Sequence, residues 1–105
     1  MTRQDFPAVD VGHGVTRQVL ADSPELMLVQ FAFSEGGRGL VHKHPHVQTT
    51  FVKAGRYSFT VGADTFEVGP GDAFAIPSDV EHSCELLEGP GVLIDSFAPR
   101  RDDFL

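Results

Sequence analysis

The stretch GGRGLVHKHPHVQTTFVKAG, residues 36–55, holds the densest group of metal-ligand side chains in the chain. His42 and His44 are separated by one residue, and on a β-strand two such side chains point to the same face. Gln48 follows four positions after His44, and Pro45 begins a turn between them. We therefore expect these three side chains to approach one divalent metal ion through two ring nitrogens and an amide oxygen.

A second stretch, GDAFAIPSDVEH at residues 71–82, ends in a further histidine. His82 would complete a four-ligand shell of three imidazoles and one amide, which suits one divalent transition metal ion (Zn, Ni, Fe, Mn or Co). A lone histidine on a strand is more often a surface or core residue, and a single His-x-His pair is incidental about as often as not. Because Gln48 is neutral, a bound ion would keep its full charge, which favours non-redox Lewis-acid chemistry on a substrate oxygen.

Short runs of aliphatic, aromatic and β-branched residues fill the chain, and 11 glycines and 7 prolines interrupt them. No segment has sustained helical periodicity, and turns are expected at residues 61–64, 69–72 and 88–91. This pattern predicts one all-β domain over residues 1–105, an antiparallel β-barrel or jelly roll with its motifs in residues 40–98 and an N-terminal arm over residues 1–10. The strands expected are Val15–Leu20, Leu26–Phe33, Gly39–His44, Gln48–Lys53, Tyr57–Val61, Thr65–Val68, Ala73–Ile76, His82–Leu87 and Val92–Phe97.

Length and charge exclude several classes of protein. The 105 residues suffice for one domain with one core. Acidic residues outnumber lysines and arginines by 15 to 8, and the net charge of −7 argues against a nucleic-acid partner. No apolar run reaches the ~20 residues of a membrane span, and the N-terminus lacks the apolar core of a signal peptide. The single cysteine, Cys84, excludes an internal disulfide and fits a cytoplasmic protein.

The strand expected at Val92–Phe97 alternates, and its orientation decides the role of one carboxylate. Leu93, Asp95 and Phe97 share one face, opposite to Ile94. If the face of Asp95 is interior, burial raises the pKa of the carboxyl and a nearby cation lowers it, which makes Asp95 a candidate general acid or base. If the other face is interior, Asp95 is solvated, and the pattern alone favours neither orientation.

Three arginines have alternative interpretations. Arg17 shares a face with Val15 and Val19, so it could point into the barrel. Arg100 and Arg101 follow the last strand and could bind a substrate carboxylate through two parallel hydrogen bonds. A solvated charged tail is the simpler interpretation of that pair.

Three further side chains lie near the expected ligands. His46 lies in the turn between them, either as a support or substrate contact or as an exposed turn residue. Cys84 shares the face of His82 and could be a ligand or nucleophile, although a small buried residue is the commoner role. His13 receives no role.

These spacings resemble the two motifs of the cupin superfamily, which implies a cupin barrel. Many cupins have Glu in the place of Gln48, and the second motif usually has Gly in the place of Asp79. The positions that match the first motif are Gly36, His42, His44, Gln48 and Gly55. The positions that match the second motif are Gly71, Pro77, Asp79 and His82.

From Gly14 to Leu105 the chain also resembles the KdgF family of small single-domain cupins. The most specific match is GVLIDSFAPRRDDFL at residues 91–105, with HKHPHVQ at residues 42–48. Such proteins act on 4,5-unsaturated monouronates released from pectin or alginate and isomerise the cyclic sugar to a linear keto form. They are typically homodimers.

The resemblance implies roles for the matching residues. Arg101 would bind the uronate carboxylate, Phe97 would pack on the sugar, and Asp95 would move protons. Val47 stands where the family commonly has Glu, so the exact substrate stays open. The implied metal ligands are His42, His44, Gln48 and His82, the implied catalytic residues are Asp95, Arg101 and Phe97, and the candidate substrate-binding residues are Arg101, Phe97, Arg17 and His46.

Two other functions fit the same residues. The chain could be another metallo-cupin, such as a dioxygenase or a lyase, and oxygen consumption would then distinguish the dioxygenase. It could instead be a binding module without turnover, which would need no proton-transfer group at Asp95. In each case the expected partner is a small molecule, and for a KdgF-like enzyme it is a carbohydrate acid. Neither a nucleic acid nor a membrane is expected as a partner.

Overall fold

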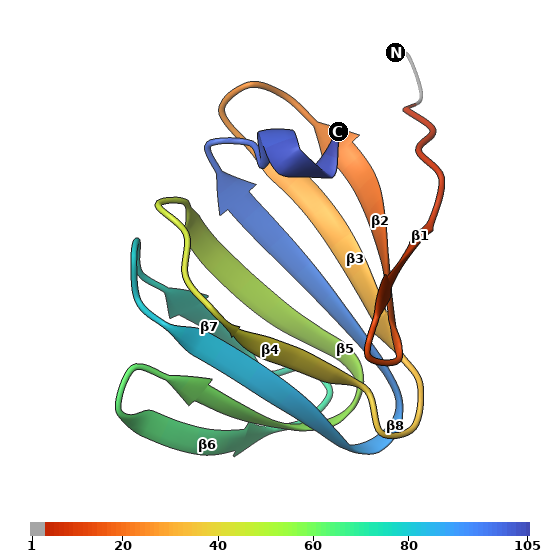
Figure 1. Ribbon diagram of the computed structural model, residues 1–105, viewed down its shortest axis with the longest axis vertical. Helices are drawn as coiled ribbons and strands as arrows, with labels where there is room; N and C mark the ends of the chain where they lie inside the picture. The colour runs from red at the N-terminus through yellow and green to blue at the C-terminus, as the bar shows by residue number, and fades with distance from the viewer. Residues whose placement is uncertain (1–3) are drawn as a thin grey trace.

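The computed structural model describes residues 4–105, and its strands wind into an antiparallel β-barrel (Figure 1). The predicted all-β fold is confirmed. Within the described part of the chain, no helix is long and apolar enough to cross a membrane. The elements are β1 Val9–Gly12, β2 Val15–Asp22, β3 Met27–Phe33, β4 Arg38–His42, β5 Val47–Val61, β6 Asp64–Val68, β7 Ala73–Ile76, β8 His82–Ala98 and the short 3-10 helix η1 Asp102–Phe104.

Two long strands, β5 and β8, form the frame of the barrel. They pair with each other along most of their length, and the sheet runs in the order β1-β2-β3-β8-β5-β6. The first part of β8 pairs with β4 and its last part with β3, while β5 pairs first with β7 and then with β6. Because each long strand has a different neighbour in each part, the sheet curls around one interior (Figure 1).

The glycines of β5 and β8 mark a bend rather than a chain reversal. The turn expected at residues 88–91 is wrong, because β8 continues through it, and the two strands expected within 48–61 are one strand, β5. Gly55 has φ +87°, and a Cβ atom there would lie 2.8 Å from the Cα of Gly91. The register of β5 against β8 shifts in this region. Glycine is therefore required where the two backbones approach each other, as at a β-bulge.

The N-terminal region contains a strand that the sequence does not indicate. β1 pairs with β2, whereas an arm was expected over residues 1–10, of which residues 1–3 lie outside the described residues. Val9 and Val11 alternate with Asp10, but the strand is only four residues long and all of it is exposed, so β1 buries no apolar face. The other two expected turns are confirmed: Val61 pairs with Asp64 across the first, and the N–H of Asp72 donates to Gly69 in the second at 3.0 Å.

Apolar side chains fill the interior in two clusters. The larger cluster surrounds Tyr57 and Phe59 and includes Leu86 and Leu93. The smaller cluster contains Met27, Val29 and Phe97, and Phe104 of η1 packs against it. The strand β8 contributes to both clusters through alternate residues.

Candidate functional site

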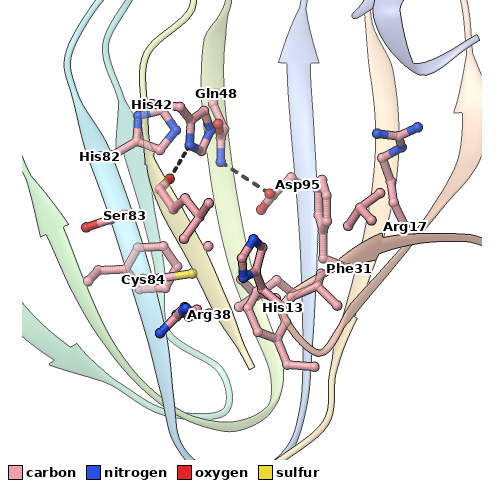
Figure 2. Close-up of a pocket in the computed structure, with 18 of the residues that line it drawn as sticks. His13, Arg17, Phe31, Arg38, His42, Gln48, His82, Ser83, Cys84 and Asp95 are labelled. Atoms are coloured by element: carbon pink, nitrogen blue, oxygen red, sulfur yellow. Dashed lines mark hydrogen bonds between the residues drawn. The ribbon is translucent and has the colours of Figure 1, made fainter. Parts of the chain in front are cut away.

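A cavity of about 270 Å³ opens into the barrel and contains most of the chemistry-bearing residues (Figure 2). Its walls are largely apolar, with a small number of polar and charged groups, which is the usual composition of a small-molecule site. The polar and charged residues that line it include His13, Arg17, Arg38, His42, Gln48, His82, Cys84, Asp95 and Arg101.

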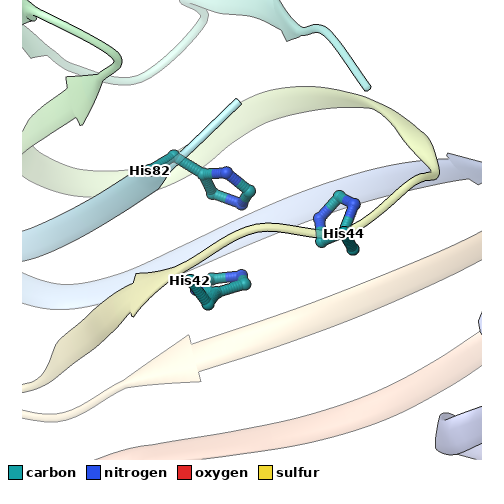
Figure 3. Close-up of side chains that lie close together, drawn as sticks. All are labelled: His42, His44 and His82. Atoms are coloured by element: carbon teal, nitrogen blue, oxygen red, sulfur yellow. The ribbon is translucent and has the colours of Figure 1, made fainter. Parts of the chain in front are cut away.

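Three histidines converge beside this cavity (Figure 3). His42 ends β4 and His82 begins β8, and the two are cross-strand partners whose ring centroids lie 4.2 Å apart. His44 lies in the loop after β4, with its ring centroid 5.0 Å from that of His82. One ring nitrogen from each histidine lies within 4.8 Å of the others, a spacing that could hold a metal ion.

The loop, rather than strand alternation, brings His44 to this position. We expected His42 and His44 on one strand, but β4 ends at His42. The carbonyl oxygen of His44 accepts a 2.8 Å hydrogen bond from the N–H of Asp79, and the Ser78 hydroxyl donates to the carbonyl of Pro45 at 2.6 Å. The loop before β8 therefore supports the loop that carries His44.

Backbone carbonyl groups orient all three rings. In His42, His44 and His82 the Nδ1 atom lies 2.7, 3.0 and 2.9 Å, respectively, from a carbonyl oxygen two residues away. A neutral ring that donates from Nδ1 has its lone pair on Nε2. Metal-binding histidines are commonly oriented in this way by the nitrogen that does not bind the metal.

Burial keeps the rings of His44 and His82 neutral. It lowers the pKa of His82 to about 4 and also lowers the pKa of His44, so both rings lack the second proton at neutral pH. The Nε2 atom of His82 is buried and has no hydrogen-bond partner among residues 4–105. An unpartnered lone pair of this kind fits a metal ligand.

Gln48 supplies an oxygen to the same site. Its Oε1 lies 3.0 Å from Nε2 of His44, while its Nε2 donates to Thr50 at 3.0 Å and to Asp95 at 3.2 Å, which fixes the orientation of the amide. Because His44 already donates from Nδ1, its Nε2 and the amide oxygen are two lone-pair atoms that face each other. A cation between them removes this conflict, so the residues present fit a divalent metal ion.

Asp95 faces the interior beside this donor set. Leu93, Asp95 and Phe97 are only 3, 4 and 2% exposed, which settles the orientation that the sequence leaves open. Burial raises the pKa of the Asp95 carboxyl to about 7, and a hydrogen bond with Thr50 opposes the shift. Its Oδ2 accepts from Gln48, and its buried Oδ1 has no hydrogen-bond partner within the described residues. The carboxyl can therefore exchange a proton near neutral pH.

The C-terminal segment brings Arg101 to the cavity wall. Its Nε and Nη2 atoms donate to the carboxylate of Asp103 at 3.0 and 2.9 Å. Its guanidinium carbon lies 4.2 Å from the ring centroid of Phe104 and 5.1 Å from that of Phe97. Arg100 lines no part of this cavity and instead forms an ion pair with Asp22 at 2.6 Å.

The structure separates the roles of His46 and Cys84. His46 does not line the cavity: its Nε2 lies 3.1 Å from the carbonyl oxygen of Arg100, and its own carbonyl orients His44. The geometry therefore places His46 behind His44, a candidate ligand. Cys84 is half-buried in the cavity wall rather than fully buried, burial raises the pKa of its thiol to about 12, and the thiol lies outside the histidine cluster.

Among the residues that line the cavity, His13, Phe31 and Arg38 had no role predicted from the sequence. His13 has φ 54°, which is uncommon for a residue other than glycine, and it lies in the turn between β1 and β2. Glycines on both sides of it also have positive φ. The Gly-His-Gly sequence was the signal for a tight turn that carries an imidazole to the cavity (Figure 2).

Comparison with known proteins agrees with this geometry. The cupin domain profile matches residues 29–97. The pectin degradation protein KdgF of Dickeya dadantii is 35% identical over 102 residues, which cover 96% of this chain and 93% of that protein. The chain belongs to the KdgF family of cupins.

Solved structures place this KdgF-family cupin among similar barrels. KdgF from Halomonas sp. aligns with a TM-score of 0.89 and 36% identity, over 94% of this chain and 93% of that one. An RmlC-like cupin from Shewanella frigidimarina aligns with a TM-score of 0.90 and 37% identity, over 95% and 89% of the two chains. The family resemblance inferred from the sequence is thus confirmed.

Proposed function

We propose that this cupin converts 4,5-unsaturated monouronates, the small acidic sugars released from pectin or alginate, to their linear keto forms. The relationship to proteins named for pectin degradation supports the substrate class. The observation that carries the reaction is the buried Asp95 carboxyl, whose pKa is raised to about 7 beside the histidine cluster. A group that is half protonated near neutral pH can take up and return a proton in one catalytic cycle.

In the proposed reaction, Asp95 accepts the proton of the C1 hydroxyl while the C1=O bond forms. The bond between C1 and the ring oxygen breaks, and its electron pair stays on the ring oxygen, which becomes the enolate oxygen at C5. Asp95 then returns the proton to C4, so that the double bond moves and C5 becomes a ketone. The reaction is an isomerisation without net oxidation, which agrees with the absence of a carboxylate from the proposed ligand set.

The metal ligands in this proposal are His42, His44, Gln48 and His82. A divalent ion held there would act as a Lewis acid and stabilise negative charge on a substrate oxygen. Zn, Ni, Fe, Mn and Co all suit three ring nitrogens and one amide oxygen.

Two residues of the cavity wall position the sugar in this proposal. Phe97 is 2% exposed and lies edge-on to the ring of His44, with centroids 5.6 Å apart, so it limits the space for water beside the reacting carbons. Arg101 is held in place by Asp103 and by the Phe104 ring. Because Nη1 makes no contact with Asp103, it stays available to a substrate carboxylate.

The test is to incubate metal-loaded protein with 4,5-unsaturated galacturonate and to follow the loss of absorbance from the conjugated double bond. The proposal expects turnover without oxygen uptake in a parallel oxygen-electrode measurement. Oxygen consumption would indicate a dioxygenase instead, and binding of the sugar without turnover would indicate a binding module.

Replacement of Asp95 tests the proton-transfer step. Asp95→Asn preserves size and a hydrogen-bond acceptor for Gln48, but it cannot exchange a proton. We expect full metal content by elemental analysis and a loss of turnover on the order of 10²–10⁴-fold. As a control, Ser96→Ala, at the next position on the opposite face of β8, should retain the wild-type rate. An Asp95→Asn protein with the wild-type rate would remove Asp95 from the reaction.

We also propose that the protein is a homodimer of the cytoplasm. Leu40 and Val41 of β4 are 52 and 66% exposed, and β1 adds exposed Val9 and Val11. Apolar side chains on strands with unpaired edges favour association with a second copy. Sedimentation of the purified protein tests this, and a monomer at micromolar concentration would contradict it.

A further inference from the structure

Two guanidinium groups stack on one aromatic ring at the wall of the cavity. The guanidinium carbons of Arg17, on β2, and of Arg101, after β8, each lie 4.2 Å from the ring centroid of Phe104. Phe104 is itself held by edge-on contacts with Phe31 and Phe97, at centroid distances of 6.1 and 5.6 Å. The ring therefore acts as a fixed platform that positions both cations.

The two cations differ in their partners. Arg101 donates twice to Asp103, so much of its charge is already neutralised. Arg17 is half-buried, lines the cavity, and forms neither an ion pair nor a hydrogen bond with any carboxylate in residues 4–105 (Figure 2). Stacking on a ring face does not replace the hydrogen bonds that a guanidinium makes with water.

We infer that Arg17 is the principal carboxylate-binding residue of the cavity, with Arg101 as its oriented neighbour. The only acidic side chain that lines the cavity, among the described residues, is Asp95, and its Oδ2 accepts a hydrogen bond from Gln48 rather than from Arg17. An incoming carboxylate therefore finds on Arg17 a half-buried guanidinium that has no carboxylate partner in residues 4–105 and can donate two parallel hydrogen bonds. Arg38 also lines the cavity without an ion pair within the described residues, but it is exposed to solvent. The inference rests on the proposed function only for the kind of carboxylate, an acidic monosaccharide.

The test compares a sugar acid with its neutral ester, so that only the carboxylate charge differs. Saturated galacturonate and its methyl ester are titrated by calorimetry into the full-length protein at low ionic strength, with and without Zn²⁺, because salt screens exposed charges. The variants are Arg17→Met, which removes the charge and keeps the chain length, and Arg17→Lys, which keeps a cation without the fork. Arg56→Met is the matched control, because Arg56 pairs with Glu67 and Glu88 and does not line the cavity.

The wild-type protein should bind the acid at least about tenfold more tightly than the ester, since a hydrogen-bonded charge pair commonly contributes this much. Arg17→Met should reduce the preference to about twofold or less, Arg17→Lys should reduce it to an intermediate value, and Arg56→Met should leave it unchanged. If Arg17→Met does not fold, as judged by its melting curve, the Arg17→Lys result alone carries the comparison.

Two results would overturn the inference: a full preference for the acid in the Arg17 variants, or no binding of galacturonate to the wild-type protein. A lost preference in Arg17→Met, combined with no turnover of the unsaturated sugar by wild type, would support the binding residue and reject the proposed reaction. The two proposals can therefore fail separately.

Discussion

At the scale of single residues, Asp79 shows why one family position favours glycine. Its φ of 61° lies in the left-handed region, which aspartate tolerates and β-branched residues do not. Its N–H also holds the carbonyl of His44. We expect Asp79→Gly to keep the unfolding free energy within about 0.5 kcal/mol and Asp79→Val to lose about 2 kcal/mol in urea titrations. Equal losses in both variants would mean that the carboxylate, and not the backbone conformation, matters at this position.

At the scale of elements, the close approach of the paired strands β5 and β8 depends on the lack of a side chain at Gly91. A Cβ atom at Gly91 would collide with the hydroxyl of Tyr57 and lie 2.6 Å from Cδ1 of Leu86. Gly91→Ala should therefore destabilise the protein by about 1–3 kcal/mol, measured by urea unfolding.

The Tyr57 hydroxyl provides the matched test of this contact. It is buried and has no hydrogen-bond partner within residues 4–105, so Tyr57→Phe alone should cost little or should stabilise the protein slightly. In the Gly91→Ala background, Tyr57→Phe should recover part of the lost stability. Purely additive effects of the two substitutions would show that Leu86, rather than the hydroxyl, makes the contact costly.

At the scale of the whole molecule, the candidate metal site links two parts of the chain that lie far apart in sequence. His42, His44 and His82 come from β4, the following loop and β8, and a ligand that binds only the folded chain stabilises it. At a free metal concentration of about 100 times Kd, the free energy of unfolding should increase by about 2.7 kcal/mol. The increase should be measurable as a higher melting temperature, which a chelator reverses. His82→Ala should abolish this rise. An equal rise in that variant would place the metal elsewhere.

Two buried groups, His82 and Asp95, make opposite contributions to the pH dependence of folding stability in the metal-free protein. The pKa of His82 is about 4 in the fold and 6.5 ordinarily, so the unfolded chain binds more protons between these values and stability rises with pH. The pKa of Asp95 is raised from 3.8 to about 7, so its contribution is fully present at low pH and is lost as the pH rises to 7.

Replacement of Asp95 leaves the contribution of His82 to the pH dependence of stability unopposed. In the presence of a chelator, the stability of Asp95→Asn should rise more steeply with pH than that of wild type between about pH 4 and pH 6.5, by at most about 1.4 kcal/mol per pH unit. Urea midpoints at several pH values measure the two slopes. Parallel slopes would mean that Asp95 titrates normally in the folded protein.

Local patterns in the sequence were sufficient for most of the strands and for the metal-ligand candidates. The expected strand at Ala73–Ile76 matches β7, and Thr65–Val68 lies within β6, because alternation and flanking turns are properties of neighbouring residues. The histidines and Gln48 stand out through their chemical type and spacing. The strand β1 was not predicted, because its alternating run is short and backbone pairing rather than apolar burial holds it.

The amino-acid sequence alone therefore determined two things: that the fold is an all-β cupin barrel, and which residues are the candidate metal ligands. Both follow from the spacing of residues close together in the chain. The tertiary structure decided which face of β8 is interior, and hence that Asp95 is buried. It also decided that Arg17 and Arg101 both stack on the ring of Phe104 in the wall of the cavity. These relations join residues far apart in sequence, and they depend on which strands pair and on the space that remains between them.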